Sequence, residues 1–174
     1  ATNEDTAKAG QVSGGDTESD PLTFSVVAHP AHGQVVMQTD GSFVYTPADD
    51  YNGPDGFTFK ANDGSVDSGP ATVSVTVNPV NDAPTANALG IVTDEDTAKA
   101  GQVSGSDTEN DPLTFSVVAQ PAHGGVVMQT DGSFVYTPAD DYNGPDSFTF
   151  KANDGSEDSD PATVSVTVNP VNDA

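Results

Sequence analysis

Carboxylates at alternate positions are the side chains of this sequence best suited to chemistry. Asp16, Glu18 and Asp20 alternate beside glycine and proline, and a turn would let them converge on one cation. Hard oxygen ligands without histidine or cysteine favour calcium over zinc or copper. The stretch is not an EF-hand, because Pro21 stands where glycine is needed and the glutamate at position twelve is missing. Alone, the triplet fits a solvated acidic turn equally well.

The overall charge excludes several partners. The 174 residues include 27 acidic side chains and 4 lysines, for a net charge of −23. A surface this acidic repels nucleic acid and anionic membranes. Without cysteine, the chain has no disulfide and no thiolate ligand. No stretch is apolar enough to span a membrane and no signal peptide is present, so we expect an internal piece of a longer protein, and export must be argued from other features.

Catalytic signatures are weak in this sequence. His29, His32 and His123 lie in predicted loops, where a histidine can act as a general base. No serine or cysteine has the context of a nucleophile, and no glycine-rich phosphate loop is present. Paired carboxylates can hydrolyse glycosides, but metal binding explains their number and their place in turns better. We therefore expect no enzyme.

Two loop tyrosines leave two interpretations open. Tyr51 and Tyr142 follow the acidic pairs Asp49-Asp50 and Asp140-Asp141. A loop aromatic can stack on a sugar ring, which would suit a calcium-dependent polysaccharide-binding module. It can also be a corner residue that packs on its own domain, which we favour because the chain has no tryptophan for a stacking site.

The chain repeats itself almost completely. Residues 4–82 match residues 95–173 at an offset of 91, and only seven of these positions differ. A period this long is one whole small domain. The repeat predicts two domains, residues 1–84 and 85–174, and the proline-containing stretch 78–84 is the stiff linker between them.

Residue alternation predicts strands and no helix of useful length. Apolar and polar residues alternate in 57–61 and 72–77, and β-branched and aromatic residues fill 22–27, 35–38 and 42–46. Residues 39–42, 52–55 and 62–65 read as turns. About seven strands per repeat predict an all-β fold of two tandem Greek-key sandwiches of the cadherin and immunoglobulin type.

The order of the acidic motifs resembles the cadherin repeat and its bacterial relatives, the cadherin-like and VCBS-type tandem repeats of large surface adhesins. The resemblance covers essentially all of both repeats. It rests on a glutamate in the first strand, an Asp-x-Glu-x-Asp loop before an aromatic strand, the Asp-Asp pair, the Ala-Asn-Asp-Gly strand end and the Val-Asn-Asp-Ala-Pro linker. The linker departs from the animal Asp-x-Asn-Asp-Asn-x-Pro pattern, because Asn78 is neutral and the order of Asn81 and Asp82 is reversed.

This resemblance implies Ca²⁺ as the cofactor, bound where the two repeats meet. The implied junction ligands are Glu4, Asp49, Asp50, Asn81, Asp82, Asp107, Glu109, Asp111 and Asp154. Two further half sites are implied at the outer ends, comprising Asp16, Glu18, Asp20, Asp63, Glu95, Asp140, Asp141, Asn172 and Asp173.

The resemblance further implies an extracellular segment on a bacterial cell surface. Its role would be a calcium-stiffened extender or a cell- or matrix-adhesion segment, and the alternative is the polysaccharide-binding module. Its partners would be neighbouring repeats of the same chain, and a polysaccharide or another cell-surface molecule. Nucleic acid and membrane insertion are not expected.

Overall fold

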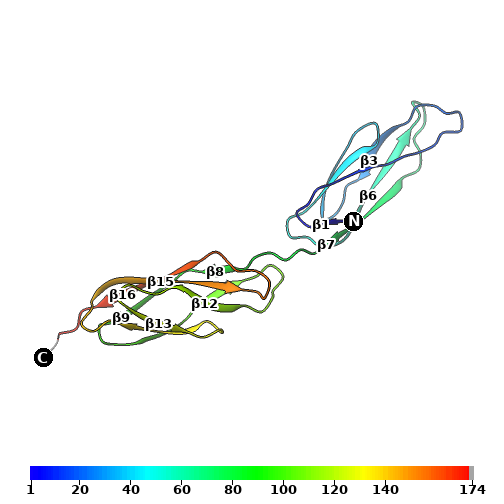
Figure 1. Ribbon diagram of the computed structural model, residues 1–174. Helices are drawn as coiled ribbons and strands as arrows, with labels where there is room; N and C mark the ends of the chain where they lie inside the picture. The colour runs from blue at the N-terminus through cyan, green and yellow to red at the C-terminus, as the bar shows by residue number, and fades with distance from the viewer. Residues whose placement is uncertain (173–174) are drawn as a thin grey trace. The chain divides into compact units, whose positions relative to one another are not determined.

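A computed structural model describes residues 1–172. Within them all regular structure is β-strand, which confirms the predicted fold class, and no helix there is long and apolar enough to cross a membrane. The chain forms two compact units, which we call unit 1 (Ala1–Val80) and unit 2 (from Asn81 onward). Figure 1 colours them in chain order, from blue to red.

Unit 1 is a sandwich of two sheets. The four-stranded sheet has the order β1-β7-β6-β3, and the three-stranded sheet has the order β2-β5-β4. β1 runs parallel to β7, and the other neighbours are antiparallel. The strands are β1 (Thr2–Asn3), β2 (Lys8–Gln11), β3 (Thr23–Ala28), β4 (Gly33–Met37), β5 (Ser42–Pro47), β6 (Gly53–Asn62) and β7 (Ala71–Asn78).

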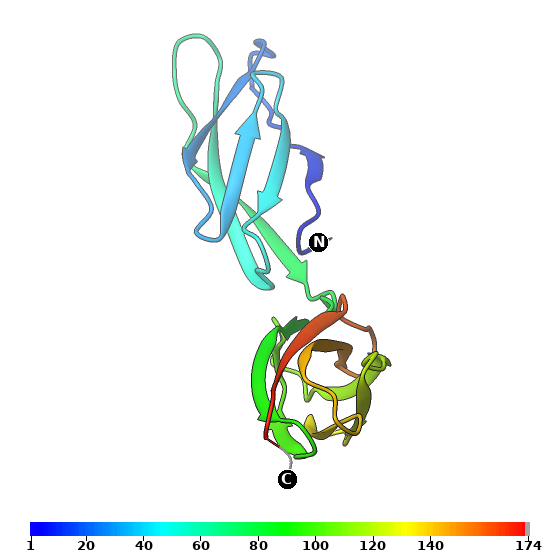
Figure 2. The same ribbon diagram turned by 90° about the vertical axis from the view of Figure 1, so that its left-hand side faces the viewer.

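Unit 2 repeats this plan and adds strands at its start. Its sheets have the orders β12-β15-β16-β9 and β10-β14-β13, and a third pairing joins β11 to β8. Figures 1 and 2 show these layers from two sides. The strands are β8 (Thr85–Asn87), β9 (Leu89–Asp94), β10 (Lys99–Gln102), β11 (Ser104–Ser106), β12 (Thr114–Ala119), β13 (Gly124–Met128), β14 (Ser133–Pro138), β15 (Gly144–Asn153) and β16 (Ala162–Asn169).

The predicted alternation of apolar and polar residues places the apolar side chains in the core. Phe57 and Phe59 on β6 point inward, as do Val75 and Val77 on β7, and all four are buried. Tyr45 on β5 of the facing sheet is fully buried and packs in one cluster with Val75 and Val77. Period-two patterning therefore places one side of each strand in the core and leaves the other in water.

One predicted turn is confirmed and another is wrong. The hairpin between β4 and β5 closes at Asp40-Gly41, where Gly41 has a φ of 86° and the carboxylate of Asp40 accepts the backbone N–H of Ser42. Residues 53–55 are not a turn, because β6 already begins at Gly53. There the chain pairs with Val77, and Gly53 supplies a φ of 133° that allows it to enter the strand directly.

The cores of the two units differ although their sequences barely do. Phe150 and Val164 in unit 2 are completely buried, whereas the matching Phe59 is 9% exposed and the matching Val73 is only partly buried. Unit 2 gains β8 and the long β9, which pairs with β16 over six residues, whereas β1 pairs with β7 over two. These strands cover core side chains that unit 1 leaves nearer to water.

We expect unit 1 to unfold before unit 2, because its core side chains are less completely buried and its first strand pairs over fewer residues. Heating the whole chain in chelator should give two transitions. Hydrogen–deuterium exchange should be faster in β6 than in β15, and the difference between Gly56 and Ser147 makes the two matching peptides distinguishable by mass. Equal exchange in the two strands would contradict this expectation.

Candidate functional site

The loop before β12 in unit 2 is closed by its first aspartate. Asp107 accepts the backbone N–H of Asp111 on Oδ1 at 2.9 Å, and its carbonyl accepts the N–H of Asn110 at 3.3 Å. Asn110 has a φ of 63°, a conformation that asparagine tolerates better than most residues. The turn buries Oδ2 of Asp107, which has no hydrogen-bond partner among residues 1–172.

The loop between β15 and β16 places a second carboxylate in the same unit. Asp154 is only 9% exposed, and its Oδ1 accepts the backbone N–H groups of Ser156 and Glu157 at 2.6 and 2.7 Å. Its Oδ2 accepts the side-chain amide of Asn81 at 2.9 Å. The hydrogen bonds from Glu157, Asn81 and Ser156 together hold the pKa of Asp154 below its usual value.

The linker residues Asn81 and Asp82 are therefore part of unit 2. Asn81 binds Asp154, and the backbone N–H of Asp82 donates to Glu109 Oε2 at 3.3 Å. We call Asn81, Asp82, Asp107, Glu109 and Asp154 the unit 2 loop cluster. Its side chains offer oxygen atoms only, apart from the amide nitrogen of Asn81, which is the donor set that calcium prefers.

The carboxylates of this cluster do not by themselves form a complete metal-binding site. In the described part of unit 2, no three carboxylates or histidines bring their ligand atoms within 4.8 Å of one another. A bound cation would therefore also need the amide oxygen of Asn81, backbone carbonyls or water, or a rotation of the carboxylates. The orphaned Oδ2 of Asp107 is the atom that such a cation would satisfy.

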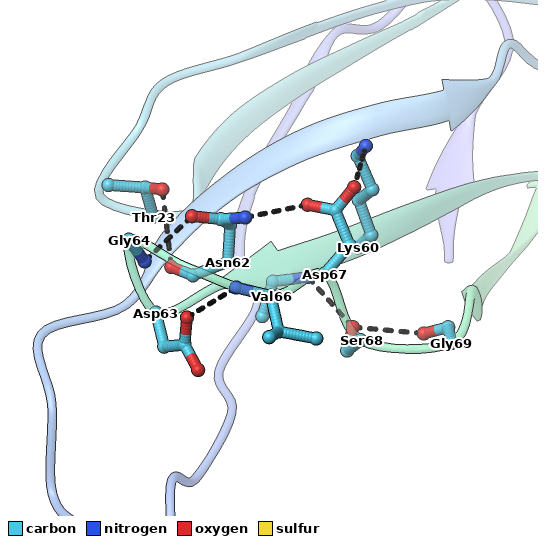
Figure 3. A network of polar contacts seen from close by, with 10 residues as sticks. Thr23, Lys60, Asn62, Asp63, Gly64, Val66, Asp67, Ser68 and Gly69 are labelled. Atoms are coloured by element: carbon cyan, nitrogen blue, oxygen red, sulfur yellow. Dashed lines mark hydrogen bonds and ion pairs between the residues drawn. The ribbon is translucent and has the colours of Figure 1, made fainter.

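The same loops in unit 1 use their aspartates to hold backbone. Asp16 Oδ1 accepts the N–H groups of Glu18 and Asp20, at 2.9 and 3.0 Å. Asp63 Oδ1 accepts Ser65 and Val66, both at 2.7 Å, as Figure 3 shows for Val66. These bonds lower the pKa of Asp63, with the bond from Val66 contributing most.

A second set of contacts steadies the loop that carries Asp63. Asp67 accepts the amide of Asn62 and forms an ion pair with Lys60 (Figure 3). The hydrogen bond from Lys60, followed by the one from Asn62, lowers the pKa of Asp67. Lys151, Asn153 and Asp158 repeat the arrangement in unit 2. Asp63 and Asp154 are thus held by hydrogen bonds within their own loops, and the neighbouring ion pairs of Lys60 and Lys151 steady the same loops.

A glutamate is buried at the opposite end of each unit. Glu4 is 2% exposed, and its carboxylate accepts the backbone N–H of Val80 and the side-chain amide of Asn52. Glu95 is 6% exposed and accepts Val171 at 2.6 Å and Asn143 at 3.0 Å. Each glutamate thereby fastens the chain just after the last strand of its unit.

Sequence reasoning missed the aspartates beside these glutamates. Asp5 Oδ1 accepts the backbone N–H of Asp50 at 3.3 Å, and Asp96 Oδ1 accepts that of Asp141 at 3.1 Å. All four residues have positive φ, between 54° and 58°. The sequence signal that could have indicated these aspartates is the adjacent Glu-Asp pair in each repeat. The structure thus brings Glu4, Asp5 and Asp50 to one end of unit 1.

The other predicted ligands lie on the surface, and their role in metal binding stays a prediction. Glu18, Asp20 and Asp111 are exposed in the acidic loops, and Asp49 and Asp140 are exposed beside the buried glutamates. Asn172 is exposed as well, and Asp173 lies outside the described residues. The resemblance implies nine junction ligands drawn from both repeats, and their joint binding of one cation stays a prediction.

Tyr51 and Tyr142 pack on their own units. The ring of Tyr51 stacks on His32 with centroids 4.1 Å apart, and its hydroxyl donates to the carbonyl of Pro54 at 2.7 Å. Tyr142 and His123 repeat the stack at 4.2 Å. One face of each tyrosine is therefore covered by a histidine, and these histidines serve as packing partners.

A partly buried network around Asp55 is the second feature that the sequence did not reveal. Its carboxylate accepts the backbone N–H groups of Ala31 and His32 and the hydroxyl of Tyr45, at 2.8 to 3.1 Å. Burial alone would raise its pKa, but the hydrogen bonds outweigh burial, and the pKa of Asp55 is lowered. Burial and this bond raise the pKa of Tyr45. The donors lie up to 24 residues away, so no local pattern could indicate them.

The comparisons with known proteins match this architecture. The Bacterial Ig domain family matches residues 1–76 and again residues 81–167. The chain belongs to this family. Its two matches coincide with the two compact units, and they confirm the resemblance to tandem immunoglobulin-like and cadherin-like repeats.

Individual relatives of this Bacterial Ig pair are distant. Integrin beta-like protein A of Dictyostelium discoideum is 32% identical over 86% of the chain, which spans only 10% of that relative's length. Human protocadherin-24 EC1-2 has a TM-score of 0.63 at 18% identity, with 92% of this chain and 88% of that one covered. Human CDH23 EC21-23 has a TM-score of 0.52 at 20% identity, with 98% and 66% covered. At these identities the solved structures show the cadherin-like fold alone.

Replacing Asp55 with asparagine should destabilise unit 1 by about 2 kcal/mol, because the charged acceptor of several hydrogen bonds is lost. Since folding lowers the pKa of Asp55, its contribution is complete above the ordinary aspartate pKa of about 3.9 and fades as the pH falls through the lowered value. Urea unfolding at pH 7 and pH 3 measures both effects.

Tyr45→Phe is the matched variant for this network. It keeps the ring in the core and removes one hydroxyl donor, so the expected loss is smaller, about 1 kcal/mol. An Asp55→Asn variant that is as stable as the parent at pH 7, or that differs from it equally at pH 3, would show that the carboxylate does not support the loop.

Proposed function

We propose that this Bacterial Ig pair is a calcium-binding tandem repeat of an extracellular bacterial adhesin. Its role is that of a calcium-stiffened extender or a cell- or matrix-adhesion segment. The single observation that supports calcium most directly is the buried Oδ2 of Asp107, which lacks a hydrogen-bond partner in the described residues and lies on the same loop as Glu109, the acceptor of the Asp82 N–H.

The chemistry of this cluster argues for a hard divalent cation. A buried carboxylate oxygen without a donor is costly, and a cation removes that cost. Calcium accepts six to eight oxygen ligands in flexible geometry, which suits a cluster drawn from two loops and the linker. Magnesium demands a tighter octahedron and keeps its waters, so it fits less well.

The charge of the whole chain favours the same conclusion. A net charge of −23 with 4 lysines leaves most carboxylates to repel one another. Only two ion pairs, those of Lys60 and Lys151, join side chains in residues 1–172. Calcium would relieve this repulsion and stabilise the folded state by mass action.

Millimolar calcium should raise the melting temperature of the whole chain, and magnesium should raise it less. Asp107→Asn should abolish most of the increase. The matched control is Asp16→Asn, which changes the same position of unit 1, where Asp16 has no buried oxygen without a hydrogen-bond partner in the described residues. Calorimetry in calcium and in chelator measures this. Equal melting curves, or an equal loss in both variants, would reject the unit 2 loop cluster as the site.

A spacer role follows from repetition and from linker binding. The reach of an extender depends on copy number, and this chain carries two nearly identical copies. A cation bound by Asn81, Asp82 and the unit 2 loops would hold the linker against unit 2 and remove its freedom there. The family match and the integrin beta-like relative support an adhesin context outside the cell, with neighbouring repeats and a polysaccharide or another surface molecule as partners.

A non-catalytic role agrees with the residues described above. Immunoglobulin-like and cadherin-like domains are typically structural or adhesive. The three histidines supply no catalytic group in this proposal, since His32 and His123 each lie against a tyrosine ring. The polysaccharide-binding alternative is weaker for the same reason, because the stacked histidine covers one face of each tyrosine that would hold a sugar.

If calcium stiffens the chain, small-angle scattering in millimolar calcium should give a narrower distribution of maximum dimensions than in chelator. The physical reason is that ligation of linker oxygens removes torsional freedom between Val80 and Pro84. Asp107→Asn should keep the broad distribution in both conditions, with circular dichroism as the control for folding. Scattering that is unchanged by calcium would contradict the extender role, whereas calcium binding itself is tested by the melting experiment.

A further inference from the structure

The three-stranded sheet of each unit has an edge strand in the middle of the repeat, β4 in unit 1 and β13 in unit 2. Each of them pairs on one side only in residues 1–172, with β5 and β14 respectively. Val35 lies opposite Tyr45 just as Val126 lies opposite Tyr136. Backbone groups of antiparallel strands alternate between the partner and the other side, so both valines present the same groups to the free edge.

A glutamine side chain closes this edge in unit 2. The amide nitrogen of Gln120 donates to the carbonyl oxygen of Val126 at 3.3 Å, and its amide oxygen accepts the N–H of Val126 at 3.1 Å. Gln120 directly follows β12, a strand of the other sheet. The backbone N–H and C=O of one residue in an added antiparallel strand would make the same pair of bonds. The amide of Gln120 therefore shows which kind of group this edge accepts.

The matching edge of unit 1 is open. His29 stands in place of Gln120, is exposed and makes no hydrogen bond within residues 1–172. The donor and acceptor of an imidazole point in different directions from a rigid ring, so they cannot face both groups of Val35 together. A second of the seven differences between the repeats, Gln34 against Gly125, lies on the same edge strand.

The β4 edge lacks the features that usually protect such strands from pairing with another chain, namely charges, proline and bulges. Residues 21–39 contain no aspartate, glutamate or lysine, although the chain has 27 acids. β4 pairs with β5 without a register shift. Val36 is 62% exposed, opposite the 44% exposed Val44. Open backbone groups beside exposed apolar side chains are what strand addition requires.

A carboxylate lies near each end of this uncharged strand. Exposed Asp40 follows β4 in the hairpin, and exposed Asp49 borders a hollow of about 600 Å³ together with Gly33 and Gln34. A second copy of β4 would bring its own carboxylates to both ends in either strand direction, so like charges would meet. A peptide with a cationic residue at each end would meet opposite charges instead.

We propose that the free edge of β4 binds an extended segment of a partner polypeptide that has alternating apolar residues in its middle and a lysine or arginine at each end. The segment adds antiparallel to β4, and its central residue bonds Val35 as the amide of Gln120 bonds Val126. Its outward side chains extend the apolar row of Val36 and Val44. Unit 2 is closed to the same segment. This role uses none of the unit 2 loop cluster and is separable from calcium binding.

The probe is a fluorescent peptide with blocked ends and the sequence Lys-Val-Thr-Val-Thr-Val-Lys, added to the whole chain in chelator so that calcium does not compete for the carboxylates. Anisotropy should show one site per chain. His29→Gln, which copies the closed edge of unit 2, should weaken binding about tenfold or more, because two hydrogen bonds are lost to the side chain. Gln120→His should raise the stoichiometry to two.

Two controls separate the edge from general attraction to an acidic protein. His29→Ala leaves the edge open and should bind as the parent does, and the same peptide with glutamate in place of both lysines should bind about tenfold more weakly or less well still. Hydrogen exchange should slow at residues 33–38, which differ in mass from residues 124–129 through Gln34 and Gly125.

Equal binding by His29→Gln and the parent, or by the lysine and glutamate peptides, would overturn the proposal. A Gln120→His variant that still binds a single peptide would overturn the role assigned to the Gln120 amide. Concentration-dependent dimers of the parent that His29→Gln removes would show that a second copy occupies the edge, and would overturn the assignment to a cationic partner.

Discussion

The main constraint on this protein is that its carboxylates have almost no cations to pair with. Four lysines face 27 acidic side chains, so backbone N–H groups must serve as partners for the acids that fold inward. Asp16, Asp55, Asp63 and Glu4 each accept at least one such group. Because a charged acceptor makes a stronger hydrogen bond than a neutral one, each of these acids organises a loop.

This use of carboxylates explains why the loops are so regular in a chain without disulfides. Asp40 closes the β4–β5 hairpin and Asp107 closes the loop before β12. Asp55 ties the loop between β3 and β4 to the start of β6, and Glu4 fastens the exit of β7. A small sandwich has little core to stabilise it, so these local contacts matter more than they would in a larger domain.

The proposed calcium binding would use the same acids. Atoms that hold backbone N–H groups are already positioned, and the second oxygen of the carboxylate remains available at Asp107. Loop closure and the proposed cation binding would therefore use different oxygens of Asp107. The linker residues that bind Glu109 and Asp154 extend this arrangement from the loops to the chain between repeats.

The sequence alone determined the repeat, the β-sandwich class, the inward face of β6 and β7 and the end loops that carry the acids. These features follow from residue alternation, turn residues and self-similarity, which act over short distances or compare the chain with itself. Only the tertiary structure decided that Asp55 holds a loop up to 24 residues away, that β6 begins at Gly53, and that Asn81 and Asp82 attach to unit 2. It alone also decided that two almost identical repeats have unequal cores. The physical reason is that strand pairing and burial depend on which distant segments meet, and in unit 2 residues 85–87 pair with β11 while residues 89–94 pair with β16.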